Sequence, residues 1–174
     1  MSFPESCLAA AARLLDACRA RGIRLATAES CTGGLVAGCL TEHPGASAVL
    51  DRGWVVYDNR AKIELLGVRP ETLASYGAVS EACARELVAG ALARSSCGLA
   101  LAATGIAGPG GGTPEKPVGL VHLAAGRRDG VVVHRRCLFP GDRRAIRLAA
   151  VETLLLLGLE ALATEARPGA AAGG

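Results

Sequence analysis

The chain has 174 residues, of which 51% are hydrophobic but only 3% aromatic, and its formal net charge is +3. This length is enough for one domain with a substantial core, which has to be built from small and aliphatic side chains. The scarcity of aromatic stacking groups and the modest charge argue against a nucleic-acid-binding surface, while a mild positive charge favours a small anionic ligand.

The predicted elements alternate between helices and strands along the chain. The periodicity predicts helices over 4–21, 31–41, 60–66, 70–75, 80–95 and 142–162, a helical turn at 46–50, and strands over 23–28, 53–58, 98–103, 118–125 and 131–138. This order indicates a three-layer α/β domain with a mixed sheet over residues 1–163. Residues 164–174 carry too little apolar surface to pack and are expected to form a loose tail.

Cysteine and histidine usage bounds the chemistry and the compartment. Seven cysteines occur without a Cys-x-x-Cys pair, and the three histidines stand apart from any polar cluster in the sequence. No metal-ligand spacing results, so we expect neither a metal nor another cofactor. Free thiols are typical of the reducing cytoplasm, where we place the protein. No run is long enough for a membrane span, and the first 22 residues predict an amphipathic helix, not a signal peptide.

The stretch LATAESCTGG, residues 25–34, predicts a strand, a tight turn and the start of a helix. Such a turn directs backbone N–H groups and the positive end of a helix dipole toward one point. Ser30 at this turn is either the N-cap of the following helix or a nucleophile facing a site for negative charge. No Ser–His–Asp triad accompanies it. Cys31 is the rival nucleophile, although an inert small residue is its simplest role.

The two lysines stand out because the other seventeen of the nineteen basic Lys and Arg residues are arginines. An arginine stays protonated in proteins, whereas a desolvated lysine can act as a base. Lys62 is therefore the candidate base for Ser30, because a neutral amine can accept the serine proton and return it to a leaving group. The alternative is that Lys62 and Lys116 persist by chance.

Three further segments carry polar groups. Tyr57 ends the second strand, and its hydroxyl either serves Ser30, Lys62 or a substrate or is an ordinary strand-end group. The glycine-rich loop that begins at Thr104 fits neither a P-loop nor a Rossmann fingerprint, yet its glycines allow a ligand to approach the backbone. Arg143 and Arg147 share a face of the last helix, which suits an anion or forms a solvated basic surface.

Five motifs together resemble the CinA C-terminal domain family, the nicotinamide-nucleotide amidohydrolases, in its stand-alone form. They are TAESCTGG (27–34), RGWVVYDNRAKIELLGV (52–68), YGAVSE (76–81), TGIAGPGGGTPEKPVG (104–119) and FPGDRRAIR (139–147). The resemblance implies a three-layer α/β/α sandwich with a mixed five-stranded sheet in which one strand is antiparallel. It also implies metal-independent deamidation of nicotinamide mononucleotide to nicotinic acid mononucleotide and ammonia. The N-terminal molybdopterin-binding-like domain of longer CinA proteins has no counterpart in this sequence.

Carried over, the resemblance makes Ser30 the nucleophile and Lys62 the base, with Tyr57 in support. The expected substrate-binding residues are Cys31, Thr32, Gly33, Thr104, Gly105, Gly108, Arg143 and Arg147. Leu120 departs from the family, in which a small polar residue is common. The expected partner is a pyridine mononucleotide, and the alanine- and leucine-rich outer helices favour a homodimer. A non-catalytic nucleotide-binding or interaction module linked to competence or DNA damage is the alternative.

Overall fold

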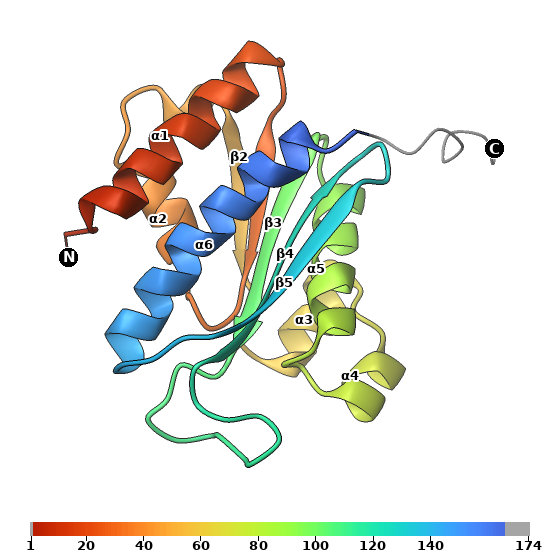
Figure 1. The fold of residues 1–174 in the computed structure, drawn as a ribbon. Helices are drawn as coiled ribbons and strands as arrows, with labels where there is room; N and C mark the ends of the chain where they lie inside the picture. Colours follow the sequence, from red (N-terminus) through yellow and green to blue (C-terminus); the bar gives the residue numbers. More distant parts are fainter. Residues whose placement is uncertain (1, 166–174) are drawn as a thin grey trace.

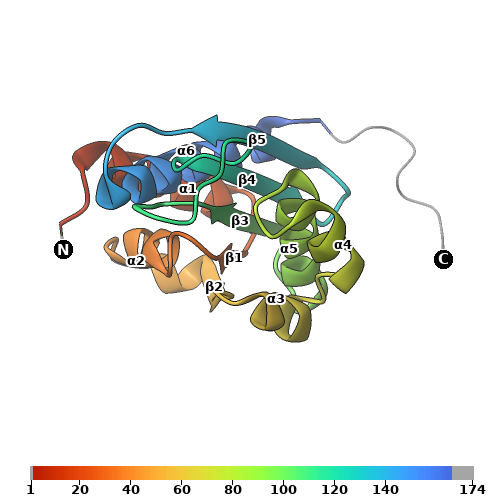
Figure 2. The same ribbon diagram turned by 90° about the horizontal axis from the view of Figure 1, so that it is seen from below.

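The computed structural model describes residues 2–165 and forms three layers, with a central sheet covered on both faces by helices (Figures 1 and 2). In chain order the elements are α1 (Glu5–Ala20), β1 (Leu25–Glu29), α2 (Leu35–Thr41), the short 3-10 helix η1 (Ala46–Ala48), β2 (Leu50–Val55), α3 (Asn59–Leu66), α4 (Pro70–Tyr76), α5 (Glu81–Ala93), β3 (Leu99–Gly105), β4 (Leu120–Arg127), β5 (Val132–Leu138) and α6 (Arg143–Ala163).

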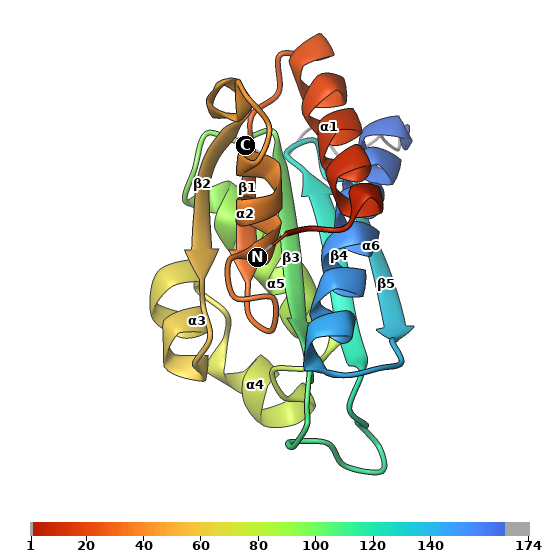
Figure 3. The ribbon, with the colours of Figure 1, turned by 90° about the vertical axis from the view of Figure 1, so that its left-hand side faces the viewer.

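The sheet has the strand order β2-β1-β3-β4-β5. β2, β1 and β3 pair in parallel, and β4 pairs antiparallel with both β3 and β5. β4 therefore runs opposite to the other four strands, which confirms the predicted five-stranded mixed sheet with one antiparallel strand. Figure 3 shows α1, α2 and α6 in front of the sheet and α3, α4 and α5 behind it.

Small side chains on one face of the sheet explain how a core almost without aromatic rings is closely packed. In β3, Leu99 and Leu101 face α1 and α6, whereas Ala100 and Ala102 face α5. Alternation of this kind follows from the two-residue repeat of a strand. Every residue from Leu99 to Thr104 is buried, which confirms the prediction of a fully buried strand.

Several element boundaries differ from the prediction by a few residues, and three of these differences bear on the site. The helix predicted from residue 31 begins at Leu35, because Gly33 and Gly34 adopt left-handed φ values of 60° and 92° in the preceding turn. The second strand ends at Val55, so Tyr57 lies in the following connection. β3 continues to Gly105, so Thr104 belongs to the strand instead of the loop. The predicted tail, apart from residues 164 and 165, lies outside the described residues.

The end of α3 makes an unusually close contact with α5. A Cβ atom added to Gly90 would lie 1.9 Å from the carbonyl oxygen of Leu66. Only glycine allows the two backbones to approach in this way. Gly67, with a φ of 69°, then ends α3 in the left-handed conformation typical of a helix C-terminus. This contact fixes the helix that carries Lys62.

We expect Asp142→Ala to lower the free energy of unfolding by about 1 kcal/mol, because the Asp142 carboxylate caps α6. Its Oδ1 accepts a hydrogen bond of 2.8 Å from the backbone N–H of Ala145. Urea titration measures the change. Asp16→Ala is the control, since its exposed ion pair with Arg19 is worth only a few tenths of a kcal/mol. Equal effects of the two substitutions would contradict the capping role.

Candidate functional site

The candidate site lies at the carboxyl ends of the parallel strands, next to which several of the predicted residues lie. Ser30 directly follows β1, and its backbone N–H donates to the carbonyl oxygen of Ala103 in β3 at 2.9 Å. Thr104 and Gly105 end β3, and Tyr57 lies just beyond β2. This edge of an open α/β sheet is where ligands bind in many folds of this type.

Ser30 shares a face of the sheet with the helix that carries Lys62. In β1, the side chain of Glu29 points toward α2, whereas Ala28 belongs to the core cluster on the α5 side. Continuing this alternation directs Ser30 toward the layer of α3 and α5. Gly34 occupies the N-cap of α2 and no side chain caps it, so the N-cap interpretation of Ser30 is wrong.

Lys62 is the largest fully buried side chain of the described residues, with 1% of its surface exposed. Asp58 caps α3 by accepting a hydrogen bond from the N–H of Arg60, which starts the helix one turn before the lysine. The Lys62 Nζ donates to the carbonyl oxygen of Tyr57 at 3.0 Å. Burial lowers the pKa of Lys62, and the nearby Cys83 and Asp58 oppose this only in part. The neutral amine is therefore favoured at a lower pH than in an exposed lysine.

Glu29 holds the turn that carries Ser30. Its carboxylate is 1% exposed and accepts backbone hydrogen bonds of 2.9, 3.0 and 2.9 Å from Gly34, Val36 and Ala37. These are donors of the first turn of α2, which otherwise have no partner within the helix. The expectation that this helix terminus faces a ligand is thus wrong, because Glu29 already satisfies it. The sequence placed Glu29 at the turn but gave it no role.

The turn still offers two backbone donors. The Gly33 N–H donates to the carbonyl oxygen of Ser30 at 3.1 Å, so Gly33 is not an open donor. Within residues 2–165, no oxygen accepts a hydrogen bond from the N–H groups of Cys31 and Thr32. Thr32 is fully buried, and Cys31 is 6% exposed. Cys31 and Thr32 are therefore the remaining candidates for an oxyanion hole.

The Cys31 thiol lies beside these donors but is poorly suited to attack. Burial raises the pKa of the Cys31 thiol to about 11, although hydrogen bonds from the backbone N–H groups of Cys31 and Thr32 lower this pKa in part. Since the thiolate is the nucleophilic form of cysteine, the thiol is almost entirely inactive near neutral pH. This argues against the rival assignment of Cys31.

Two arginines of α6 connect the turn, the glycine-rich loop and Tyr57. Arg147 donates to the carbonyl oxygens of Cys31 at 3.1 Å and Thr32 at 2.7 Å, so it braces the turn. The exposed Arg143 donates to the carbonyl oxygen of Gly108 at 2.8 Å and to the Tyr57 hydroxyl at 2.9 Å. Both arginines therefore lie at the site, and the hydrogen bonds described for them are to protein groups.

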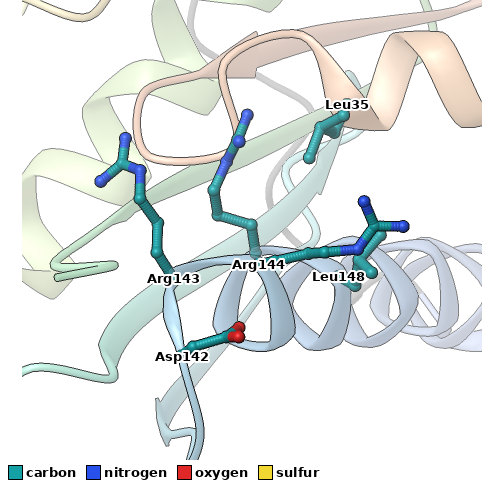
Figure 4. Close-up of a pocket in the computed structure, with 6 residues that line it drawn as sticks. Leu35, Asp142, Arg143, Arg144 and Leu148 are labelled. Carbon is teal, nitrogen blue, oxygen red and sulfur yellow. The ribbon is translucent and has the colours of Figure 1, made fainter. Parts of the chain in front are cut away.

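A cavity of about 340 Å³ opens between the starts of α2 and α6 (Figure 4). Leu35 and Leu148 supply apolar surface, and Asp142 lies at the helix start. The cavity is also lined by Arg143, Arg144 and Arg147. An anionic group with an apolar portion matches this combination of side chains.

A histidine pair that the sequence analysis did not anticipate lies on the α5 face of the sheet. His122 Nδ1 is 3.0 Å from His134 Nε2, the rings stack, and His134 Nδ1 is 3.3 Å from a Glu81 carboxylate oxygen. Burial lowers the pKa of His122 to about 4, so its imidazole is neutral near neutral pH. The expectation that no histidine joins a polar cluster is wrong. The register that aligns Ala124 with His134 makes the two histidines diagonal neighbours.

The residues from 2 to 165 contain no group of three or more His, Cys, Asp or Glu side chains arranged to hold a metal ion. In the same part of the chain, no helix combines the length and apolar character that a membrane crossing requires.

Together these features define a three-layer α/β/α domain with a serine turn and a buried lysine at one end of its sheet. The sequence matches the CinA C-terminal domain family over residues 8–162, and the chain belongs to this family. It is 49% identical over 135 residues to the nicotinamide-nucleotide amidohydrolase PncC of Escherichia coli K12, a match that covers 78% of this chain and 82% of that protein.

Longer relatives and solved structures give the same assignment. A CinA-like protein of Akkermansia muciniphila is 54% identical over 125 residues, which are 72% of this chain and 30% of that protein. The chain thus spans about a quarter to a third of the CinA-like relatives it matches. A solved structure described as competence/damage inducible protein CihA from Agrobacterium tumefaciens is 50% identical, with a TM-score of 0.91, and the match covers 94% of this chain and 99% of that chain.

We expect Glu29→Gln to lower the free energy of unfolding by about 2 kcal/mol, because an amide nitrogen replaces one oxygen that accepts from a backbone N–H. The same change loosens the turn and lowers any activity that depends on Ser30. Chemical denaturation measures the stability. Glu42→Gln, at the exposed far end of the same helix, is the matched control and should change stability by less than about 0.5 kcal/mol. Equal stability of the two variants would show that Glu29 does not hold the turn.

Proposed function

We propose that the protein is an amidohydrolase that converts nicotinamide mononucleotide and water to nicotinic acid mononucleotide and ammonia. The observation that carries the proposal is the fully buried Lys62, whose pKa is lowered by burial. Strand alternation continued from β1 directs Ser30 toward the same face of the sheet. The likeness to proteins named nicotinamide-nucleotide amidohydrolase supplies the substrate. We further place the protein in the cytoplasm and propose that it acts as a homodimer.

In the proposed mechanism the neutral Lys62 amine accepts the proton of the Ser30 hydroxyl, and Oγ attacks the carboxamide carbon. The N–H groups of Cys31 and Thr32 stabilise the tetrahedral oxyanion, and each such donor contributes on the order of 3 kcal/mol. Lys62 returns the proton to the nitrogen, ammonia leaves, and an acyl-serine ester remains. Lys62 then accepts a proton from water, whose oxygen attacks the ester, and returns that proton to Ser30 Oγ as the carboxylic acid leaves.

Substrate binding is assigned to the groups around this reacting pair. Arg143 is exposed and already reaches Gly108 and Tyr57, so it is the arginine with the better access to a phosphate. Arg147 orients the oxyanion donors through their carbonyl groups. Thr104 and Gly105 at the end of β3 complete the wall beside Ser30, and Tyr57, 58% exposed, covers the opening.

We expect Ser30→Ala and Lys62→Met to lower ammonia release from the mononucleotide by a factor of about 1,000 or more, because each removes one member of the reacting pair. Cys31→Ser is the matched control and should retain activity. A coupled assay of ammonia formation by the three variants decides whether Ser30 or Cys31 is the nucleophile. An active Ser30→Ala protein and an inactive Cys31→Ser protein would instead identify Cys31 as the nucleophile.

The Lys62→Arg variant tests whether Lys62 acts as a proton-accepting base or only as a permanent positive charge. Arginine cannot be deprotonated in a protein, so we expect this variant to be inactive even where circular dichroism shows it folded. Full activity of Lys62→Arg would contradict the amine-base mechanism. Binding of the mononucleotide to wild type by calorimetry, without ammonia formation, would favour a non-catalytic nucleotide-binding module, a role suggested by the competence and damage descriptions of the solved relatives.

The pH dependence follows from the lowered pKa of Lys62. The base acts in its deprotonated form, so kcat/KM should rise with pH through that pKa and level off above it. Because burial lowers the pKa, the midpoint of this rise lies below the ordinary lysine value of about 10.4. The dependence of kcat/KM on pH, measured from neutral to alkaline pH, gives this midpoint. A midpoint at the ordinary lysine pKa would contradict the assignment of Lys62 as the base.

A further inference from the structure

The second lysine, Lys116, occupies a site that the reaction leaves unexplained. It belongs to the glycine-rich loop, defined here as residues 107–118, between the ends of β3 and β4. The base of this loop is closed by hydrogen bonds of 2.8 Å from Gly119 N–H to Ile106 O and from Ile106 N–H to Leu120 O. Beyond this base, residues 110–115 are exposed, so the position of the loop depends on a few anchoring contacts.

Lys116 connects the glycine-rich loop to the segment between α4 and α5. Its Nζ donates to the carbonyl oxygen of Tyr76 at 2.5 Å and to that of Val79 at 2.8 Å. Residues 113–116 form a turn that holds Lys116 in place. In this turn the Thr113 N–H donates to Lys116 O and the Lys116 N–H donates to Thr113 Oγ1. One ammonium group thus joins two segments that lie far apart in the sequence.

The carbonyl oxygens between these two acceptors are also occupied by side chains. Gly77 O accepts from the Ser80 hydroxyl and Ala78 O from the Thr104 hydroxyl, each at 2.8 Å. Four consecutive carbonyl groups, from Tyr76 to Val79, therefore each meet a side-chain donor. Since Thr104 is the last residue but one of β3 and follows Ala103, which accepts from the Ser30 N–H, this cluster ties the loop to the same sheet edge as the reacting residues.

The space around Nζ suits an ammonium group better than a guanidinium group. Gly77 has a φ of 74°, and a Cβ atom added there would lie 3.1 Å from Nζ. The ammonium is compact and directs its donors from a single atom, whereas a guanidinium is a larger planar fork. This accounts for a lysine at this position in a chain whose other basic residues, apart from Lys62, are all arginines.

We propose that Lys116 is a positioning residue that fixes the glycine-rich loop against residues 76–79 as a wall of the substrate site. The loop has a second anchor, because Gly108 O accepts from Arg143, which also reaches Tyr57. With both anchors in place, the loop backbone and Arg143 are held ready for the nucleotide. Loss of the Lys116 anchor weakens substrate binding but leaves Ser30 and Lys62 intact. The role in binding rests on the proposed function, whereas the role in loop position does not.

Lys116→Met, which keeps the aliphatic stem but removes the donors, tests the proposal together with Lys116→Arg. Hydrogen–deuterium exchange of peptides covering residues 105–119 should become about tenfold faster in Lys116→Met. KM for the mononucleotide should rise about tenfold while kcat stays within about threefold of wild type. Lys116→Arg should recover only part of each effect. Arg135→Met, which breaks an exposed ion pair with Glu160 on the other side of the molecule, is the matched control.

Unchanged exchange of the loop peptides in a folded Lys116→Met protein would overturn the proposal. So would a loss of kcat at constant KM, since that would place Lys116 in the chemical step. Should wild type release no ammonia at all, the proposed function falls, while the exchange measurement still decides whether Lys116 fixes the loop.

Discussion

The interaction on which the site depends is the buried carboxylate of Glu29. A buried charge needs strong hydrogen bonds to offset the loss of hydration, and the three backbone N–H groups at the start of α2 provide them. This requirement fixes where the helix begins relative to β1. The intervening residues then form a tight turn that holds Ser30, and within residues 2–165 no oxygen accepts a hydrogen bond from the N–H groups of Cys31 and Thr32. Arg147 of α6 stabilises the same turn by donating hydrogen bonds to the carbonyl oxygens of Cys31 and Thr32.

The proposed base lies on the face of the sheet opposite the Glu29 side chain and is fixed independently. Asp58 starts α3, the Gly90 contact holds its end, and Tyr57 O receives the amine. The serine and the lysine thus belong to separate elements whose positions are set by packing instead of by a direct bond between them. Preorganisation of this kind lowers the cost of reaching the reactive geometry. It also explains why the groups around the site form so many bonds to backbone carbonyl oxygens.

Local patterns in the sequence were sufficient for the layers and for the strand–turn–helix around Ser30, and they singled out Lys62, which is buried. They failed where distant groups decide the outcome. The apolar pattern runs unbroken into α2, so only the carboxylate of Glu29 and the left-handed glycines reveal that the helix starts at Leu35. The pairing of His122 with His134 depends on the register of β4 and β5, which a one-residue shift would abolish. The partners of Arg143 and Arg147 lie about 35 to 116 residues away.

The contact between Gly90 and Leu66 limits how the protein can be made more heat-resistant. Replacing glycine by alanine inside a helix is a standard route to stability, worth up to about 1 kcal/mol. In α5 this route is closed at Gly90, because a methyl group would push α3 away from its place and displace the lysine it carries. Relatives adapted to high temperature should therefore gain stability on the opposite side of the sheet, in the helices α1 and α6, and keep a glycine at this position.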